Sequence, residues 1–379
     1  MPDEKLTAYR GGKALRRGWT TGSCAAAASQ AAAVLLLTGI APPEIHLHTP
    51  GGITFCLPVE DAHMSGNAAV CTVRKDAGDD PDITNGVRIT ASVRRIEKGV
   101  TIEGGAGVGR ITRPGLAMPV GEAAINPGPR QQIADAVHRA AQQNGYGGGF
   151  SVTISVKDGE ALAAQTYNGH LGIVGGISIL GTSGIVEPMS EKALVDTIRL
   201  ELDSLYAQGQ RIAFLCPGNY GADFARDTLG LELGRAVKCS NFIGEALDHA
   251  VYRGYPDILL VGHAGKLVKL AAGGMNTHSS VADGRQEIFT AHAALCGAGQ
   301  DTLAALMEAV SVDACVAALD KAGLREPVLA RIGKAMEERL ARRLKQRAHG
   351  AFIMFTGQYG VLAESPDARR LCGKLREDV

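Results

Sequence analysis

Two histidines lie in one polar, glycine-rich stretch in the second half of the chain, residues 257–285. His263 follows a short apolar run, and His278 lies beyond a pair of glycines. Imidazole changes its charge near neutral pH, so each ring is a candidate to move a proton during a reaction. The alternative is an imidazole held by a backbone hydrogen bond, which is the more common situation. We predict His263 and His278 as the catalytic candidates.

The same stretch supplies cations and an amide that suit a ligand rich in carboxylates. Residues 258–261 form an unbroken apolar run, which predicts a strand buried on both faces, and residues 266–270 predict the first turns of a helix. A glycine turn between them leaves free backbone N–H groups, which bind anions. Ammonium and guanidinium groups add charge-assisted hydrogen bonds to carboxylates. The candidates are Lys266, Lys269, Asn276 and Arg285.

Three more loops repeat the order of strand, polar loop and helix: residues 181–184 (GTSG), 217–221 (PGNYG) and 239–241 (CSN). Repeats of this order predict a parallel sheet with right-handed crossovers. Loops that follow its strands all leave the sheet at one edge, where α/β proteins bind small ligands. We therefore expect these loops and residues 262–266 (GHAGK) to converge on one site, with the candidate residues Gly181, Thr182, Ser183, Glu187, Gly218, Asn219 and Asn241.

The first half offers hydroxyl groups just before an alanine-rich helix that Gly39 closes. The hydroxyls, the free amides of the helix start and two adjacent arginines would together form an anion site. A capped core helix with two solvated arginines explains the same residues equally well. The candidates for substrate binding are Arg16, Arg17, Thr20, Thr21 and Ser23.

Two further clusters are open to more than one interpretation. Residues 75–86 (KDAGDDPDITNG) contain four aspartates, of which Asp80 is a candidate to bind ribose hydroxyls, although a solvated turn favours the same residues. The calcium-loop pattern is not met, because no glutamate closes it. Residues 105–109 contain GxGxG, but a Pro-Gly segment follows instead of a helix. We therefore reject a dinucleotide-binding turn there.

Hydrophobic periodicity divides the chain into two predicted domains. Residues 45–57, 69–73 and 87–96 alternate in the manner of antiparallel strands. The predicted fold class is an α+β N-terminal domain with a mostly antiparallel sheet, followed by an α/β domain with a parallel sheet and flanking helices. We place the domains at residues 1–168 and 169–365, and a C-terminal tail at residues 366–379.

Composition limits the classes of partner. The 379 residues carry 39 basic and 39 acidic side chains, so no net charge draws the chain to nucleic acid or to an anionic membrane. The longest apolar run, residues 31–37, is shorter than the ~20 residues of a membrane span, and the N-terminus lacks the apolar segment of a signal peptide. The eight cysteines form no CxxC pair, so no zinc knuckle is predicted. We expect a cytoplasmic protein.

The assembled motifs resemble the CbiD family, the cobalt-precorrin-5B C1-methyltransferases of anaerobic cobalamin biosynthesis. They cover most of residues 15–290 in the family's order, and the remaining C-terminal part carries fewer of them. The matching stretches are LRRGWTTGSCAAAA, VRKDAGDDPDITNG, GAGVGRITRPGLAMPVGEAAINPGPR, LGIVGGISILGTSGIVEPMSE, PGNYG, VKCSNFIGEALD and LVGHAGKLVKLAAGGMNTHS.

The resemblance implies methyl transfer from S-adenosylmethionine to ring carbon C1 of cobalt-precorrin-5B, giving cobalt-precorrin-6A. The cobalt belongs to the substrate, and no protein-bound metal is expected. The chain has no GxGxG turn between a strand and a helix, so we expect a different set of loops to bind the donor. We assign the donor to Asp80, Gly181, Thr182, Ser183, Glu187, Gly218, Asn219 and Asn241. The cations and hydroxyls named above are assigned to the carboxylates of the substrate.

Two other functions fit part of the pattern. A phosphate- or nucleotide-handling enzyme would also place glycine loops at helix starts, but the chain has no GxxxxGK[ST] motif and no acidic pair after a strand. A non-catalytic tetrapyrrole-binding protein would share the basic loops without a donor site. A homo-oligomer is compatible with the sequence.

Overall fold

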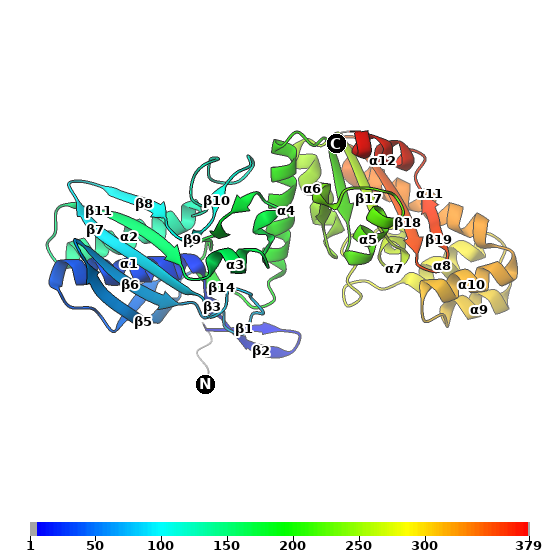
Figure 1. Ribbon diagram of the computed structural model, residues 1–379. Coiled ribbons are helices and arrows are strands. Elements are labelled where there is room, and N and C mark those ends of the chain that lie inside the picture. The colour runs from blue at the N-terminus through cyan, green and yellow to red at the C-terminus, as the bar shows by residue number, and fades with distance from the viewer. Residues whose placement is uncertain (1–5, 378–379) are drawn as a thin grey trace. The chain divides into compact units, whose positions relative to one another are not determined.

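The computed structural model describes residues 6–377 and divides into two compact units, Met1–Glu191 and Lys192–Val379. The predicted boundary at residue 168 falls inside unit 1, because short strands beyond it pair with strands of that unit. β12 (Ile173–Val174) pairs with β10 (Arg110–Ile111), and β13 (Gly176–Ile177) pairs with β9 (Gly107–Val108). The predicted mixed α and β class is confirmed, since each unit combines helices with a sheet (Figure 1).

Unit 1 is built on a six-stranded sheet in the order β4-β5-β6-β7-β11-β8. Neighbouring strands are antiparallel except β11 and β8, which run parallel. The hairpin predicted around residues 50–52 joins the first two strands. The strands are β4 (Glu44–His48), β5 (Thr54–Ser65), β6 (Ala68–Arg74), β7 (Arg88–Ile96), β11 (Gly149–Val156) and β8 (Val100–Gly104).

Two helices cover one face of this sheet, α1 (Thr21–Thr38) and α2 (Pro127–Gln143). Thr20 caps α1, since its hydroxyl accepts a hydrogen bond from the Ser23 amide, and Gly39 ends the helix at φ 75°. The alanines of α1 are fully buried, and their small size allows close packing against α2 and the sheet. α1 is long and apolar enough to cross a membrane, but 72% of it is buried inside the protein, as in a core helix.

Short elements complete unit 1: β1 (Thr7–Arg10), β2 (Lys13–Arg16), β3 (Gly18–Trp19), β14 (Ile185–Val186) and the helix α3 (Gly159–Ala163). The GxGxG segment forms a close-packed turn among them. Gly107 has φ +74°, and a Cβ there would lie 2.0 Å from the Val156 carbonyl oxygen. These glycines therefore serve backbone packing within unit 1.

Unit 2 is built on a five-stranded sheet in the order β16-β15-β17-β18-β19. The first four strands are parallel, and β19 is antiparallel to β18. The strands are β15 (Ile212–Cys216), β16 (Ala236–Lys238), β17 (Asp257–His263), β18 (His349–Thr356) and β19 (Gly360–Glu364). Side chains of β17 alternate between two cores, with Leu260 in one and Leu259 in the other. Helices therefore cover both faces of this sheet.

The helices of unit 2 divide between the two faces. One core contains residues of α4 (Glu191–Ala207), α6 (Ile243–Arg253), α7 (Ala264–Leu267), α8 (Arg285–Ala294), α9 (Gln300–Met307), α10 (Val312–Ala322) and α11 (Arg325–Leu344). The other contains residues of α5 (Asn219–Asp227) and α12 (Ala368–Glu377). The prediction of a loose tail at residues 366–379 was wrong for its described part, because α12 buries Leu371, Cys372 and Leu375.

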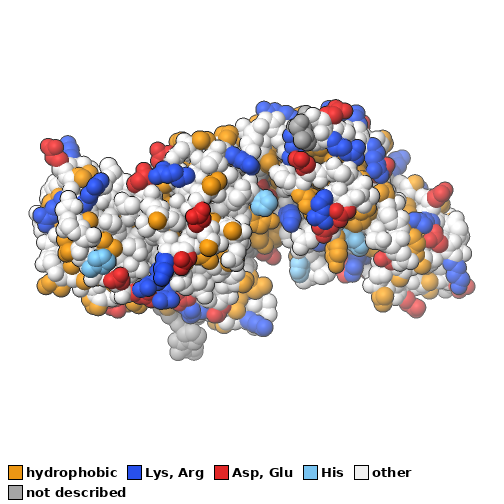
Figure 2. All heavy atoms as spheres, in the orientation of Figure 1, with side chains coloured by type: hydrophobic (Ala, Val, Ile, Leu, Met, Phe, Trp, Pro, Cys, Tyr) orange, Lys and Arg blue, Asp and Glu red, His pale blue; other side chains and the backbone are white. Residues whose placement is uncertain are grey.

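Charge is mixed over the surface. The formal net charge is +0, and Figure 2 shows basic and acidic side chains interspersed over the visible face. Any site for an anionic ligand must therefore be made by a local arrangement of residues.

Candidate functional site

The strand order of unit 2 reverses between β15 and β17. From β15 the chain passes through α5 to β16 on one side, and then through α6 to β17 on the other side of β15. The helices of these two crossovers lie on opposite faces of the sheet. The carboxyl ends of the two central strands therefore flank a topological switch point, where open α/β sheets bind their ligands.

Glycines shape this switch point. Gly218 precedes α5 and has φ +102°, a conformation that residues with a Cβ rarely adopt. Gly221 lets α5 approach β17, because a Cβ there would lie 2.6 Å from the Val261 carbonyl oxygen. The loop after β15 and the loop after β17 consequently lie against each other at the edge of the sheet.

Lys266 connects the loops at this edge. Its half-buried ammonium donates a hydrogen bond to the Ser240 carbonyl (3.3 Å) and would lie 3.4 Å from a Cβ on Gly218. Burial lowers the pKa of Lys266 below the ordinary lysine value. Next to it, the Lys238 ammonium donates to the Asn219 side-chain oxygen (3.2 Å). The structure thus brings Gly218, Asn219 and Lys266 together, as the sequence predicted for their loops.

His263 ends β17 and caps the helix that follows. Its Nδ1 accepts a hydrogen bond from the Gly265 amide (3.1 Å), so in the neutral ring the proton is on Nε2. Burial lowers the pKa of His263. The ring lies near those of Tyr220 (5.9 Å between centroids) and Phe355 (5.8 Å). Through this Nδ1 hydrogen bond His263 positions the loop after β17, and its predicted catalytic role stays a prediction.

Lys269 is buried in unit 2. The residue is 3% exposed, and its ammonium donates to the Thr277 carbonyl (3.0 Å) and lies 3.7 Å from Asp283. Asp283 also accepts two hydrogen bonds from Arg285, at 2.6 and 3.0 Å. The Lys269 ammonium is thus engaged inside unit 2, and its predicted contact with substrate stays a prediction. Arg285 is likewise engaged by a carboxylate of the protein.

The segment that carries His278 is tied to the loop after β16. The Thr277 amide donates to the Asn241 carbonyl (3.0 Å), and Asn276 forms a bridge with Phe242. The Asn276 side chain accepts from the His278 amide (3.1 Å). The exposed His278 ring contacts the Ser280 hydroxyl through Nδ1 (2.6 Å). Asn241, Asn276 and His278 are thus brought to one part of unit 2.

The GTSG loop belongs to unit 1, contrary to the prediction that it leaves the parallel sheet. β14 pairs with β3, and the Ser23 hydroxyl donates to the Gly184 carbonyl (2.7 Å). A Cβ on Gly181 would lie 2.3 Å from the Thr20 hydroxyl. The apolar run at residues 171–180 contains only the two-residue strands β12 and β13, which pair with strands of unit 1, so it does not extend the parallel sheet of unit 2.

The hydroxyls at the start of α1 hold this loop in place. Thr20, Thr21 and Ser23 are 5%, 3% and 0% exposed. The Thr21 hydroxyl accepts a hydrogen bond from the Leu180 amide (2.9 Å). These three residues therefore join two segments of unit 1, and their predicted contacts with substrate stay predictions.

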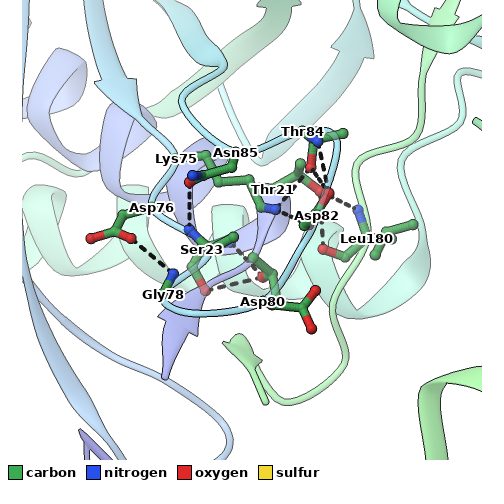
Figure 3. A network of polar contacts seen from close by, with 12 residues as sticks. Thr21, Ser23, Lys75, Asp76, Gly78, Asp80, Asp82, Thr84, Asn85 and Leu180 are labelled. Atoms are coloured by element: carbon green, nitrogen blue, oxygen red, sulfur yellow. Dashed lines mark hydrogen bonds and ion pairs between the residues drawn. The ribbon is translucent and has the colours of Figure 1, made fainter. Parts of the chain in front are cut away.

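The aspartate loop is held by contacts within the protein (Figure 3). Asp82 pairs with the buried Lys75 ammonium, which also donates to Thr84 (2.8 Å). Arg16 donates two hydrogen bonds to Asp76, at 2.6 and 2.8 Å. Asp80 accepts from the Met189 amide (2.9 Å) and so joins this loop to the segment after β14. Asp80 is thus brought close to the segment that follows the GTSG loop, and Arg16 is bonded to the aspartate loop.

A cavity of about 390 Å³ remains in this part of unit 1. Arg17 donates a hydrogen bond to Glu187 across it (3.3 Å). Three of the residues that line it, Arg17, Ser183 and Glu187, were predicted as site residues. The other lining residues are Gly51, Gly52, Ile53 and Ile185. Thr182 is exposed beside the start of α2, where a Cβ on Gly128 would lie 3.5 Å from its Cα.

Comparison with known proteins places the chain in a family. Residues 8–188 match the CbiD family model, and residues 276–366 match the model described as CbiD, C-terminal domain. A relative from Ruminiclostridium cellulolyticum is 50% identical over 92% of this chain and 90% of its own length. The chain belongs to the CbiD family. The resemblance drawn from the sequence motifs is confirmed.

Other CbiD relatives match over similar lengths. One from Alkaliphilus metalliredigens is 43% identical over 97% of both chains, and one from Salmonella typhimurium is 44% identical over 82% of both. All three relatives are named cobalt-precorrin-5B C(1)-methyltransferase. The crystal structure of a cobalamin biosynthesis protein (cbiD) from Archaeoglobus fulgidus is 29% identical, with coverage of 73% of this chain and 86% of that one and a TM-score of 0.40.

Sequence reasoning missed two residues at the edge of the CbiD sheet in unit 2. Tyr220 belongs to the predicted PGNYG loop, and its ring is 78% exposed beside His263. Its sequence signal was an aromatic residue inside a glycine loop after a strand. Glu201 lies on α4, is 9% exposed and interacts with the Lys238 backbone; burial raises its pKa to about 7. A glutamate in an amphipathic helix gives no such signal from sequence.

Proposed function

We propose that this CbiD protein catalyses methylation of cobalt-precorrin-5B at C1, giving cobalt-precorrin-6A in the anaerobic adenosylcobalamin pathway. The observation that carries this function is identity over nearly whole chains: curated relatives of that name are 43–50% identical over 86–97% of this chain. A carrier role and a nucleotide-handling role lack such support.

We infer S-adenosylmethionine to be the methyl donor. The methyl group moves from the sulfonium to the nucleophilic ring carbon, the C–S bond electrons stay on sulfur, and S-adenosylhomocysteine leaves as a neutral thioether. Because the sulfonium is already activated, the protein mainly aligns sulfur, methyl and carbon. This chemistry requires a pocket for the donor and a pocket that binds the carboxylates of the substrate. It does not require a nucleophilic side chain.

The donor site that we propose lies at the switch point of unit 2. Support comes from the reversal of strand order between β15 and β17 and from the glycine-shaped loop at Gly218. Amide N–H groups at the start of the nine-residue α5 and the Lys266 ammonium suit the carboxylate of the donor's methionine part. Asn219 and Asn241 supply amides for hydrogen bonds to ribose or adenine.

Tyr220 provides an aromatic surface for the adenine ring. It is 78% exposed on the first turn of α5, and an aromatic side chain in that position stacks favourably on a base. We therefore assign Lys266 to the donor instead of the substrate, because its ammonium lies beside Gly218.

For the substrate, Arg17 of unit 1 is the candidate that we retain for a carboxylate. Its guanidinium lines the 390 Å³ cavity with Ser183 and Glu187. The nearby hydroxyls are buried, and Lys269 and Arg285 are engaged in unit 2, so we do not propose them for this role. His278 remains a proposed proton carrier because its exposed ring reaches solvent.

The direct test is transfer of a labelled methyl group. Full-length protein is incubated with cobalt-precorrin-5B and S-adenosylmethionine carrying a ¹³C methyl, and the product is analysed by mass spectrometry and NMR. We expect one label per product molecule, on C1. Binding of the tetrapyrrole without transfer would favour the carrier alternative. Binding of nucleoside triphosphates but not of S-adenosylhomocysteine would favour the nucleotide alternative.

A further inference from the structure

The solvent-facing side of the β4–β5 hairpin in unit 1 carries three different metal-ligand types. Along β4, Glu44 and His46 point outward, while Ile45 and Leu47 between and beside them are buried. Cys56 on β5 is exposed and is the direct cross-strand partner of His46. Direct partners in an antiparallel pair have Cβ atoms about 5 Å apart, so the three side chains are neighbours.

Their ligand atoms already converge. One carboxylate oxygen of Glu44, one imidazole nitrogen of His46 and the Cys56 sulfur lie within 4.8 Å of one another. Glu44 Oε1 and His46 Nε2 are 3.1 Å apart. The Cys56 thiol is hydrogen-bonded to the Glu44 carboxylate. The carboxylate thus links the other two groups.

We propose that Glu44, His46 and Cys56 form a binding site for a divalent transition-metal ion, with Zn²⁺ as the ion of best fit. Zn²⁺ binds sulfur, imidazole nitrogen and carboxylate oxygen at about 2.0–2.3 Å. Mg²⁺ and Ca²⁺ prefer oxygen ligands, so the thiolate and imidazole select against them. Three protein ligands leave the fourth tetrahedral position to water. On binding, the Cys56 sulfur forms a bond to the ion and its proton passes to solvent.

The hairpin holds the three side chains on a rigid base. The inward side chains Leu47, Phe55 and Leu57 are 1%, 4% and 0% exposed and belong to the core of unit 1. Five residue pairs fix the register of β4 against β5. Rotation of the side chains is therefore enough to bring the three ligand atoms to the distances found around a tetrahedral ion. The backbone of the hairpin is already ordered before the ion binds.

Cobalt(II) titration of the full-length protein, without tetrapyrrole or donor, tests this site. Co²⁺ replaces Zn²⁺ in such sites and reports a sulfur ligand through an intense thiolate-to-metal absorption band in the near ultraviolet. We expect one Co²⁺ per chain with this band, displacement by Zn²⁺, and a rise in the melting temperature of the wild type with Zn²⁺. Cys56→Ser should abolish the band, and His46→Ala should weaken Zn²⁺ binding by more than ~100-fold.

Two matched variants serve as controls. Cys296→Ser removes another cysteine that is not fully buried, and His63→Ala removes an exposed histidine that pairs with Asp61 (3.5 Å) on β5. Both should leave the band and the Zn²⁺ affinity unchanged. No thiolate band in the wild type, or a band that persists in Cys56→Ser, would overturn the proposal. Because all three positions are exposed, the metal-free variants should keep the melting temperature of the wild type.

Discussion

At the scale of single residues, the chemistry of a side chain depends on whether its polar group is already used. Lys266 and Lys269 have the same type and lie one helical turn apart. Lys266 is half-buried at the edge of the sheet, whereas Lys269 is 3% exposed and donates to Thr277. We therefore expect Lys266 to act in ligand binding and Lys269 to position the segment that carries His278.

Substituting each lysine by methionine separates these roles. Lys269→Met leaves the Thr277 carbonyl and Asp283 without their buried partner, so the free energy of unfolding of unit 2 should fall by about 1–3 kcal/mol. Lys266→Met should change it by less than about 1 kcal/mol but weaken binding of S-adenosylhomocysteine ~10-fold, or about 1.4 kcal/mol. Urea denaturation and calorimetric titration measure the two effects. A stable Lys269→Met protein that has lost only tetrapyrrole binding would restore the original substrate role.

Tyr220 gives a second contrast at this scale. Removing a stacking partner of a base costs about 1–3 kcal/mol, so Tyr220→Ala should weaken S-adenosylhomocysteine binding at least ~5-fold. Tyr252 on α6 is equally exposed, at 80% against 78%, and lies away from the loops after β15 and β17 in the sequence. Tyr252→Ala should therefore bind like the wild type. Equal losses in both variants would argue against adenine stacking.

Glu201 makes stability depend on pH. Its pKa is raised from 4.5 to about 7 by burial, so the folded protein holds this proton more tightly than the unfolded chain. The contribution of Glu201 to the free energy of unfolding is complete below pH 4.5 and is lost as the pH rises through about 7. This contribution is on the order of 3 kcal/mol. Glu201→Gln should reduce the difference in unfolding free energy between pH 5 and pH 8, and the exposed Glu287→Gln should not. If the unfolding free energy of Glu201→Gln depended on pH as in the wild type, the raised pKa of Glu201 would be refuted.

At the scale of elements, glycine contacts decide how closely α5 approaches β17. Gly221→Ala should favour the helix by ~1 kcal/mol through propensity alone, but its Cβ would lie 2.6 Å from the Val261 carbonyl oxygen. α5 must therefore move, and we expect S-adenosylhomocysteine to bind ~10-fold more weakly. Gly234→Ala is the control, since a Cβ there meets nothing within 4 Å. If Gly221→Ala bound S-adenosylhomocysteine as tightly as the wild type, α5 would not be part of the donor site.

The same elements explain which features the sequence could predict. The helix end at Gly39, the hairpin at residues 50–52 and the buried strand at residues 258–261 depend on local patterns and were predicted correctly. Of the three hydroxyl residues predicted at the start of α1, Thr20 is the one that caps the helix. The GTSG loop was assigned to the wrong sheet because an apolar, glycine-rich run before a polar loop looks the same in either unit. The hydrogen bonds that bury Thr21 and Ser23 are made to partners distant in the sequence, Leu180 and Gly184, which no local pattern reveals.

At the scale of the whole molecule, the chain combines two units with separate hydrophobic cores, and it belongs to the CbiD family over nearly its full length. The proposed donor residues Gly218, Asn219, Asn241 and Lys266 lie between the segments matched by the two family models. Their assignment therefore depends on the geometry of unit 2, and mainly on the reversal of strand order beside β15.

A crystal structure of the full-length protein with S-adenosylhomocysteine tests this assignment most directly. We predict electron density for the ligand at the carboxyl ends of β15 and β17, with its carboxylate near Lys266 and its adenine on Tyr220. Density in the cavity lined by Arg17 and Glu187 of unit 1, with the switch point of unit 2 empty at saturating ligand, would contradict the proposed donor site.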